Sequence, residues 1–194
     1  MTGAAASGDV IDVRHLTKRF GGRAVVDDVS MKVRRGEIVG FLGPNGSGKT
    51  TTIRLMCGLL RLDEGEGEVL GFDLRTQSAR IKDRVGYMTQ KFSLYEDLTI
   101  EENLALVAGL YRLPDPEAKV RATLEGLGLA ARRAQLAGKL SGGWKQRLAL
   151  AACIMHSPDL LLLDEPTAGV DPKARREFWD EIHRLAADGM TVLV

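Results

Sequence analysis

The stretch that decides the fold reads Gly43-Pro44-Asn45-Gly46-Ser47-Gly48-Lys49-Thr50. It matches G-x-x-x-x-G-K-[ST], the pattern of a loop that binds phosphate between a strand and a helix. Its glycines let backbone N–H groups turn inward around an anion, and the start of the following helix adds its positive dipole end. Lys49 is placed to reach the β- and γ-phosphates of a nucleotide, and the Thr50 hydroxyl is placed to ligate Mg²⁺. The alternative is a glycine-rich turn without a ligand, which the flanking strand and helix disfavour.

The segments around this loop predict an α/β core that begins with antiparallel strands. Residues 37–42 are nearly all apolar, which suits a strand buried on both faces of a parallel sheet, and residues 50–57 suit a helix. Residues 10–13 and 25–33 partly alternate apolar with polar side chains, as half-buried antiparallel strands do. Gly21-Gly22 marks a turn between these two strands.

The middle of the chain is predicted to be a helical insertion in that core. Short strands are expected within 65–73 and at 85–88. A T-x-x-E capping box then opens a helix over 99–110, and a second helix is expected over 117–127. Because this section carries no further strand pattern, we expect a helical subdomain over about 91–157.

Two carboxylates follow the next apolar run, which covers residues 160–163. A strand buried there would deliver Asp164 and Glu165 to its carboxyl end, where α/β folds bind ligands. Asp164 would hold Mg²⁺, directly or through water, and Glu165 would polarise an attacking water. An apolar strand that merely enters a solvated loop is the alternative, and the phosphate-binding motif upstream disfavours it. A helix capped by Asp171 and a final strand from Thr191 complete the expected core.

Composition limits the classes of protein that fit. The chain has 194 residues, enough for one domain, and 27 basic against 26 acidic residues, which gives no electrostatic reason to expect a nucleic-acid partner. No apolar run approaches the roughly 18–20 residues that span a bilayer, and the first residues lack the pattern of a signal peptide. We therefore expect a cytoplasmic chain. Cys57 and Cys153 lie in no metal-binding pattern, so reduced thiols without metal are expected.

A third motif connects the first two to a known family. By itself, Leu140-Ser141-Gly142-Gly143-Trp144-Lys145-Gln146-Arg147 could be explained by Ser141 as the N-cap of a helix. Together with the other motifs, it resembles the signature sequence of the ATP-binding cassette (ABC) ATPases. The family usually has glutamine where this chain has Trp144, but the Ser-Gly-Gly is intact. The resemblance covers residues 10–194, and residues 1–9 are expected to be a flexible N-terminus.

The resemblance implies an α/β P-loop NTPase with a mainly parallel sheet core, an N-terminal antiparallel part and the inserted helices. It also implies that two cassettes pack head to tail around ATP and Mg²⁺, each signature helix facing the nucleotide of the other chain. The residues implied to bind nucleotide are Phe20, Gly43, Pro44, Asn45, Gly46, Ser47, Gly48, Lys49, Thr50, Thr51, Ser141, Gly142 and Gly143. Thr50, Gln90 and Asp164 are implied at the metal, and Glu165 and Gln90 in catalysis.

Three of these implied roles compete with plainer interpretations. Phe20, expected to stack on adenine, could instead be a core phenylalanine. Gln90 could be a solvated loop residue. Asp171, in the segment that resembles the loop contacting the partner cassette, could be only a helix cap, and both of its roles can hold at once.

Residues 86–99 and 142–147 look most like exporters of the multidrug and antibiotic efflux branch. That resemblance implies an ATPase subunit at the inner face of the cell membrane that powers efflux through a separate membrane permease. Phe92, Leu94 and Tyr95 are implied to touch the permease, with a locally packed loop as the alternative.

Two other functions are alternatives to transport. A soluble ABC ATPase of translation or DNA repair is disfavoured by the single cassette and by the absence of long heptad arms. An ATP-binding fragment without turnover is the other alternative. The family's fold continues past Val194 to a histidine that contacts the γ-phosphate, and none of His15, His156 and His183 matches it. We therefore expect the 194 residues to bind ATP but to hydrolyse it poorly.

Overall fold

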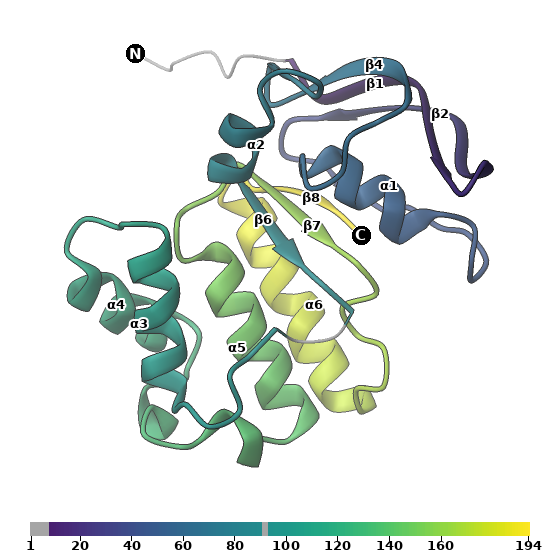
Figure 1. The fold of residues 1–194 in the computed structure, drawn as a ribbon. Helices are drawn as coiled ribbons and strands as arrows, with labels where there is room; N and C mark the ends of the chain where they lie inside the picture. Colours follow the sequence, from purple (N-terminus) through teal and green to yellow (C-terminus); the bar gives the residue numbers. More distant parts are fainter. Residues whose placement is uncertain (1–7, 91–92) are drawn as a thin grey trace.

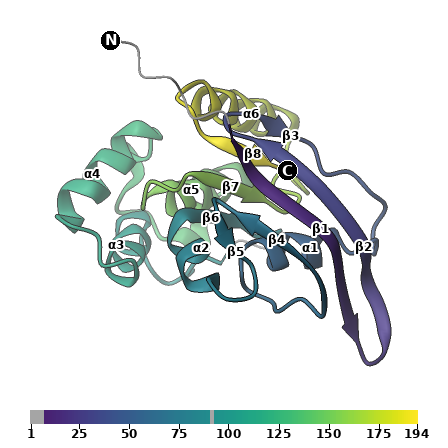
Figure 2. The same ribbon diagram turned by 90° about the horizontal axis from the view of Figure 1, so that it is seen from above.

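The computed structural model describes residues 8–90 and 93–194, and its framework is a pair of β-sheets with helices around them (Figures 1 and 2). One sheet is antiparallel, with the strand order β2-β1-β4-β5, and the other is parallel, with the order β3-β8-β7-β6. The predicted α/β class, with an antiparallel N-terminal part and a parallel core, is confirmed. Of the terminus predicted to be flexible, residues 1–7 lie outside the described part.

The antiparallel sheet consists of β1 (Asp9–Phe20), β2 (Arg23–Arg34), β4 (Glu64–Val69) and β5 (Phe72–Asp73). Gly21 and Gly22 form the predicted turn between the first two strands, both with positive φ. β1 runs further than the sequence pattern indicated. The register shifts between Val13 and Leu16, and this irregularity interrupts the alternation of apolar and polar side chains.

The parallel sheet is built from β3 (Ile38–Val39), β6 (Val85–Met88), β7 (Leu160–Leu163) and β8 (Thr191–Leu193). All four leucines of β7 have no exposed surface, as predicted. The strand predicted over 37–42 is much shorter than expected. β3 pairs only with β8, at the edge of the sheet, and the chain leaves it at Gly40, so that Leu42 is 91% exposed.

β7 separates two apolar cores. Leu160 and Leu162 pack with α1 (Lys49–Met56) and the antiparallel sheet, whereas Leu161 and Leu163 pack with α5 (Gly142–Ile154) and α6 (Pro172–Ala187). Figure 1 shows α5 and α6 side by side along the parallel strands, with α1 under the antiparallel sheet. The phosphate-binding loop lies between β3 and α1, as predicted, but Ile38 and Val39 of β3 are only half-buried.

The remaining helices are α2 (Ser78–Arg84), α3 (Ile100–Leu110) and α4 (Pro116–Gly126). Thr99 makes the predicted capping box with Glu102 at the start of α3. α3 and α4 pack with α5 through a core of their own, in which Ile100 and Leu148 are fully buried. Short 3₁₀ turns at Ala130–Arg132 and Ala137–Lys139 lead from α4 to α5.

α2 has no counterpart among the elements expected from the sequence. Its N-cap, Gln77, makes no side-chain capping bond, and Ile81 is its one buried residue, so the segment carries neither a start signal nor an apolar stripe. Within residues 8–90 and 93–194, no helix is both long and apolar enough to cross a membrane. Cys57 and Cys153 are free thiols whose pKa values burial raises, that of Cys153 to about 12.

Candidate nucleotide-binding site

The loop from Gly43 to Gly48 is a cradle that only glycine allows at its tightest points. Gly46 and Gly48 have φ values of 80° and 88°, in the left-handed region. A Cβ added at Gly48 would lie 2.3 Å from the carbonyl oxygen of Val25, so no side chain fits there. The backbone of β2 therefore closely approaches the end of the loop, just before α1.

Lys49 is the first residue of α1, and its ammonium lies over the loop. Nζ donates hydrogen bonds to the carbonyl oxygens of Gly43 at 2.5 Å and Pro44 at 3.1 Å, and lies 3.7 Å from Glu165 Oε1. The cation thus lies at the Gly43–Pro44 end of the loop, close to the second carboxylate after β7. Its present partners are oxygen atoms, which phosphate oxygens could replace.

Thr50 and Asp164 bring two oxygen ligands together from distant parts of the chain. Thr50 Oγ1 donates a hydrogen bond to Asp164 Oδ1 at 3.0 Å, and Asp164 is only 3% exposed at the end of β7. The backbone N–H of Asp164 donates to the Met88 carbonyl at 2.9 Å, which fixes the end of the strand. A hydroxyl next to a carboxylate is the donor set that Mg²⁺ prefers, so these residues fit the metal implied by the sequence.

Glu165 follows directly and carries the second carboxylate. Gln90 Nε2 donates to Glu165 Oε2 at 2.9 Å, while the other carboxylate oxygen faces Lys49. Gln90 is exposed, but it is not a solvated loop residue without a partner. Glu165 has a φ of 49°, an uncommon backbone conformation for a residue with a side chain and one often found at functional sites.

Lys49, Asp164 and Glu165 line one cavity of about 540 Å³, within the range of small-molecule sites. Its polar wall includes Gly43, Lys49, Asp164 and Glu165, and Trp179 of α6 lies on its apolar side. The structure thus brings Lys49, Thr50, Gln90, Asp164 and Glu165 together, as the sequence motifs predicted.

The other residues expected at the nucleotide lie around this group. Pro44, Asn45, Gly46 and Ser47 are exposed on the loop, and Thr51 is in the first turn of α1. Phe20 ends β1 with 48% of its surface exposed and Lys18 Nζ 5.5 Å from its ring centroid, so it is not a core phenylalanine.

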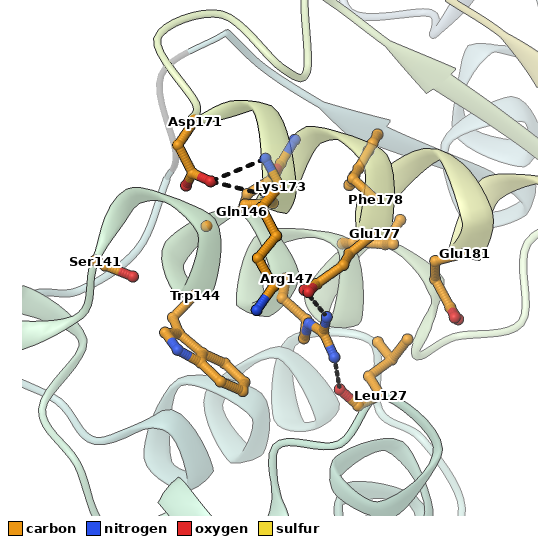
Figure 3. Close-up of a pocket in the computed structure, with 13 residues that line it drawn as sticks. Leu127, Ser141, Trp144, Gln146, Arg147, Asp171, Lys173, Glu177, Phe178 and Glu181 are labelled. Carbon is orange, nitrogen blue, oxygen red and sulfur yellow. Dashed lines mark hydrogen bonds and ion pairs between the residues drawn. The ribbon is translucent and has the colours of Figure 1, made fainter.

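The signature residues lie at a different place, at the start of α5 (Figure 3). The described residues that line the cavity at the phosphate-binding loop do not include Ser141, Gly142 or Gly143. Ser141 is the N-cap residue of α5, as predicted, but its side chain makes no capping hydrogen bond. Asp171, in contrast, caps α6, accepting from the backbone N–H groups of Lys173 and Ala174 at 3.1 and 3.0 Å.

The two signature glycines have different surroundings. A Cβ at Gly143 would lie 2.6 Å from the Cβ of Ala174, so glycine is needed there for α5 to pack against α6. A Cβ at Gly142 would meet nothing within 4 Å. Gly142 therefore has no steric reason within its own described chain to lack a side chain.

Trp144 has a role that the sequence did not reveal. Two guanidinium groups lie over its ring, that of Arg132 at 4.7 Å and that of Arg147 at 5.2 Å from the ring centroid. Arg147 also donates to Glu177 Oε2 at 3.0 Å and to the Leu127 carbonyl at 3.3 Å (Figure 3). The residue that departs from the family pattern thus links the segment after α4 to α5, and Arg147 links α5 to α6.

The loop expected to face a permease is held by Asn103. Its side chain accepts from the Tyr95 N–H at 2.9 Å and donates to the Tyr95 carbonyl at 3.0 Å. Leu94 packs partly against the core of the helical subdomain, whereas the Tyr95 side chain is 57% exposed. Phe92 lies outside the described residues.

Comparison with known proteins gives consistent matches. The family model described as ABC transporter matches residues 26–168. The probable multidrug ABC transporter ATP-binding protein YbhF of Escherichia coli (strain K12) is 49% identical over 187 residues, which are 95% of this chain and 32% of that protein. The linearmycin resistance ATP-binding protein LnrL of Bacillus subtilis (strain 168) is 38% identical, over 95% of this chain and 60% of that protein. The chain thus spans about a third of the first relative and three-fifths of the second.

Solved structures give the same result. A nucleotide-free ATP-binding cassette from an ABC transporter superposes with a TM-score of 0.85 at 26% identity, covering 96% of this chain and 80% of the other. The ATP binding subunit of an ABC transporter superposes with a TM-score of 0.81 at 30% identity, covering 95% and 78%.

Proposed function

The chain belongs to the ABC transporter family of ATP-binding domains, and from this premise we propose that it hydrolyses ATP to drive export through a separate membrane permease. The observation that carries the proposal is the convergence of Lys49, Thr50 and Gln90 on the two carboxylates at the end of β7. Cation, hydroxyl, amide and carboxylates are the groups that phosphoryl transfer requires for positioning and charge stabilisation.

In this proposal, the backbone N–H groups of residues 43–50 and the Lys49 ammonium bind the β- and γ-phosphates of ATP. Lys49 exchanges its bonds to the Gly43 and Pro44 carbonyls for bonds to phosphate oxygens. Thr50 and Asp164 would hold Mg²⁺, with Gln90 near it, and the ion would neutralise charge on the phosphate oxygens.

Glu165 acts on the attacking water. The water oxygen bonds to the γ-phosphorus, the bond from that phosphorus to the bridging oxygen of ADP breaks, and the Glu165 carboxylate accepts a proton from the water. Gln90 holds that carboxylate through its hydrogen bond to Oε2. Nucleotide binding would remove Lys49 from the other carboxylate oxygen and leave it free for the water.

The signature residues act on a second chain. Ser141 is exposed and makes no capping bond, and Gly142 meets open space, so both are available to a nucleotide held by a partner cassette. A head-to-tail dimer with two-fold symmetry makes this arrangement reciprocal. Each of its sites would combine residues 43–51, Gln90, Asp164 and Glu165 of one chain with residues 141–143 of the other.

The remaining assignments rest on the family. Residues 10–194 would form one ATP-binding domain with a helical subdomain over about 91–157, and Phe20 would stack on adenine. Leu94 and Tyr95 would contact the permease, which holds the chain at the inner face of the cell membrane. Export is favoured because relatives carry the names of multidrug, linearmycin-resistance and daunorubicin-resistance proteins. The slow turnover expected of the 194 residues stays a prediction.

Titration with a fluorescent ATP analogue, followed by phosphate release at increasing protein concentration, tests this function. We expect saturable, Mg²⁺-dependent binding, and turnover per chain that rises with protein concentration because the site forms between two chains. Saturable binding without phosphate release at any concentration would instead support the alternative of an ATP-binding fragment. Absence of binding would contradict the proposal altogether.

A further inference from the structure

Gln146 is a buried polar side chain that none of the roles described so far uses. It lies in the second turn of α5, is 1% exposed, and its Nε2 donates a hydrogen bond to the Pro166 carbonyl oxygen at 2.7 Å. A carbonyl oxygen only accepts, so the amide nitrogen must be the atom that faces it. The contact joins two segments that are 20 residues apart in sequence.

The accepting carbonyl belongs to the residue directly after Glu165. Pro166 is buried, so its carbonyl oxygen is separated from water and would have no hydrogen-bond donor among the described residues without Gln146. Glu165 itself has a φ of 49°, a conformation that persists only where the surroundings hold it. The turn continues with a bond from the Ala168 N–H to the Glu165 carbonyl at 3.1 Å. Gln146 therefore holds the peptide next to the strained residue that carries the second carboxylate.

We propose that Gln146 is a positioning residue for ATP hydrolysis, which fixes the Glu165 carboxylate by holding the Pro166 carbonyl. The inference rests on the proposed function of Glu165. It adds a connection, within one chain, between the start of α5 and that carboxylate. Ser141 and Gly142, at the start of the same helix, would face the partner's nucleotide. A displacement of this helix end by the partner would thus be transmitted through Gln146 to the chain's own Glu165.

The packing at the start of α5 supports such a connection. Gly143 lies against Ala174 without room for a side chain, and Arg147 is paired with Glu177 at 3.0 Å. This end of α5 is thus held against α6 on the flanks of Gln146. A helix end packed so closely moves as a unit with its neighbours, rather than adapting residue by residue.

The first test separates binding from turnover. Gln146→Leu removes the donor with similar bulk, and we expect kcat to fall by about 10- to 100-fold, as for a small misplacement of a catalytic group, while the Kd for the ATP analogue changes less than about twofold. Gln135→Leu is the matched control, because Gln135 also donates to a backbone carbonyl, that of Lys139 at 3.4 Å, in the helical subdomain. A parallel loss of affinity, or an equal loss of turnover in the control, would overturn the proposal.

The second test uses pH. Gln146→Glu keeps the side-chain length, but an ionised carboxylate cannot donate to the Pro166 carbonyl, whereas the protonated acid can. Because burial favours the neutral acid, the turnover deficit relative to wild type should shrink as the pH falls from about 8 to about 6. The deficit of Gln146→Leu should stay constant over that range. Identical pH profiles for the two variants would mean that Gln146 only fills space.

The third test needs no turnover, so it distinguishes failure of this inference from failure of the proposed function. Hydrogen exchange of the nucleotide-free protein reports the backbone amides of Ala168 and Val170, which close the turns after Glu165. We expect about tenfold faster exchange there in Gln146→Leu and none of this change in Gln135→Leu. If wild type hydrolyses ATP but exchange is unchanged in Gln146→Leu, the inference is wrong and the function stands. If wild type does not hydrolyse ATP, the proposed function fails, and the role of Gln146 in hydrolysis fails with it.

Discussion

The phosphate-binding end and the signature end of the molecule differ in how complete they are. At the first, Lys49, Thr50 and Gln90 already make hydrogen bonds or ion pairs with the two carboxylates after β7. At the second, Ser141 is exposed and Gly142 meets no atom within 4 Å. One region is assembled within the chain, and the other presents backbone to the outside.

The glycines at the phosphate-binding end and at the signature end differ in the same way. Gly48 is required because the backbone of Val25 approaches it, whereas nothing in the described chain explains Gly142. The proposed function assigns the open space at Gly142 to the nucleotide of a partner chain. The comparison therefore separates residues that should affect binding by one chain from those that should affect turnover by two.

The largest effect should come from Glu165→Gln. Removing the group that accepts the proton should lower turnover by about 100-fold or more, while nucleotide affinity is retained because the phosphate-binding loop is untouched. The mutant should also accumulate as the ATP-bound dimer. Phosphate release and light scattering with ATP measure the two outcomes. A mutant that stays monomeric at high protein and ATP concentrations would contradict the proposal that the signature end acts on a partner chain.

Lys49→Ala should weaken binding of the ATP analogue by roughly 10- to 100-fold. A hydrogen bond to a charged group contributes about 1.5–3 kcal/mol, and this cation is held over the loop. The exposed Lys82 of α2 provides the control, since Lys82→Ala should bind like wild type. Equal affinity in both variants would show that the cradle does not bind phosphate.

Gly142→Leu and Gly143→Leu sharpen the comparison within the signature end. Gly142→Leu should keep the stability and ATP affinity of wild type but lower turnover about tenfold or more, because it blocks close approach of the partner's phosphate to backbone donors. Gly143→Leu should lower the free energy of unfolding by roughly 1–3 kcal/mol, because its side chain overlaps Ala174. Urea unfolding and phosphate release distinguish them, and equal stability of the two variants would contradict the packing described for α5 and α6.

Trp144→Ala should have a smaller effect, lowering the free energy of unfolding by about 2 kcal/mol. It removes two cation–π contacts and part of the apolar packing of the helical subdomain. Trp144→Phe should retain part of that stability. Both variants should bind the ATP analogue like wild type, because the phosphate-binding end is separate. A loss of affinity in either would show that the two ends are coupled in the nucleotide-free chain.

The smallest effect should be a pH dependence at the far end of α5, outside both regions. Burial lowers the pKa of His156; the Val85 carbonyl and Asp83 oppose this shift, and Lys119 adds to it. The folded chain then binds fewer protons than the unfolded chain, so this stability is present above the unfolded pKa near 6.5 and is lost as the pH falls below it. Urea unfolding should find that acidification destabilises wild type more than His156→Gln. The same pH dependence in both would exclude His156 as its source.

Strong local signals predicted much of the fold. The leucine run of β7, the capping box at Thr99 and the Asp171 cap placed three elements almost to the residue, because each depends on neighbours in sequence. The length and burial of β3 were overestimated because both depend on its place at the sheet edge. α2 was missed because it lacks an apolar stripe, and the extent of β1 because a register shift interrupts its pattern.

The candidate site divides in the same way. The convergence of Lys49, Thr50, Asp164 and Glu165 follows from motifs that lie on a loop and a strand end. The bond of Gln146 to Pro166 and the contact of Trp144 with Arg132 depend on how α5 packs against distant segments. No spacing in the sequence encodes those contacts.

The two tryptophans give the protein an internal optical readout of both ends. Trp179 lines the cavity at the phosphate-binding loop, and Trp144 contacts two guanidinium groups near Ser141 and Gly143. Indole emission responds to nearby charge and to water, so nucleotide entry should change the emission of Trp179 and arrival of a second chain that of Trp144. With one tryptophan replaced by phenylalanine at a time, stopped-flow fluorescence can time the two events separately in an unlabelled protein.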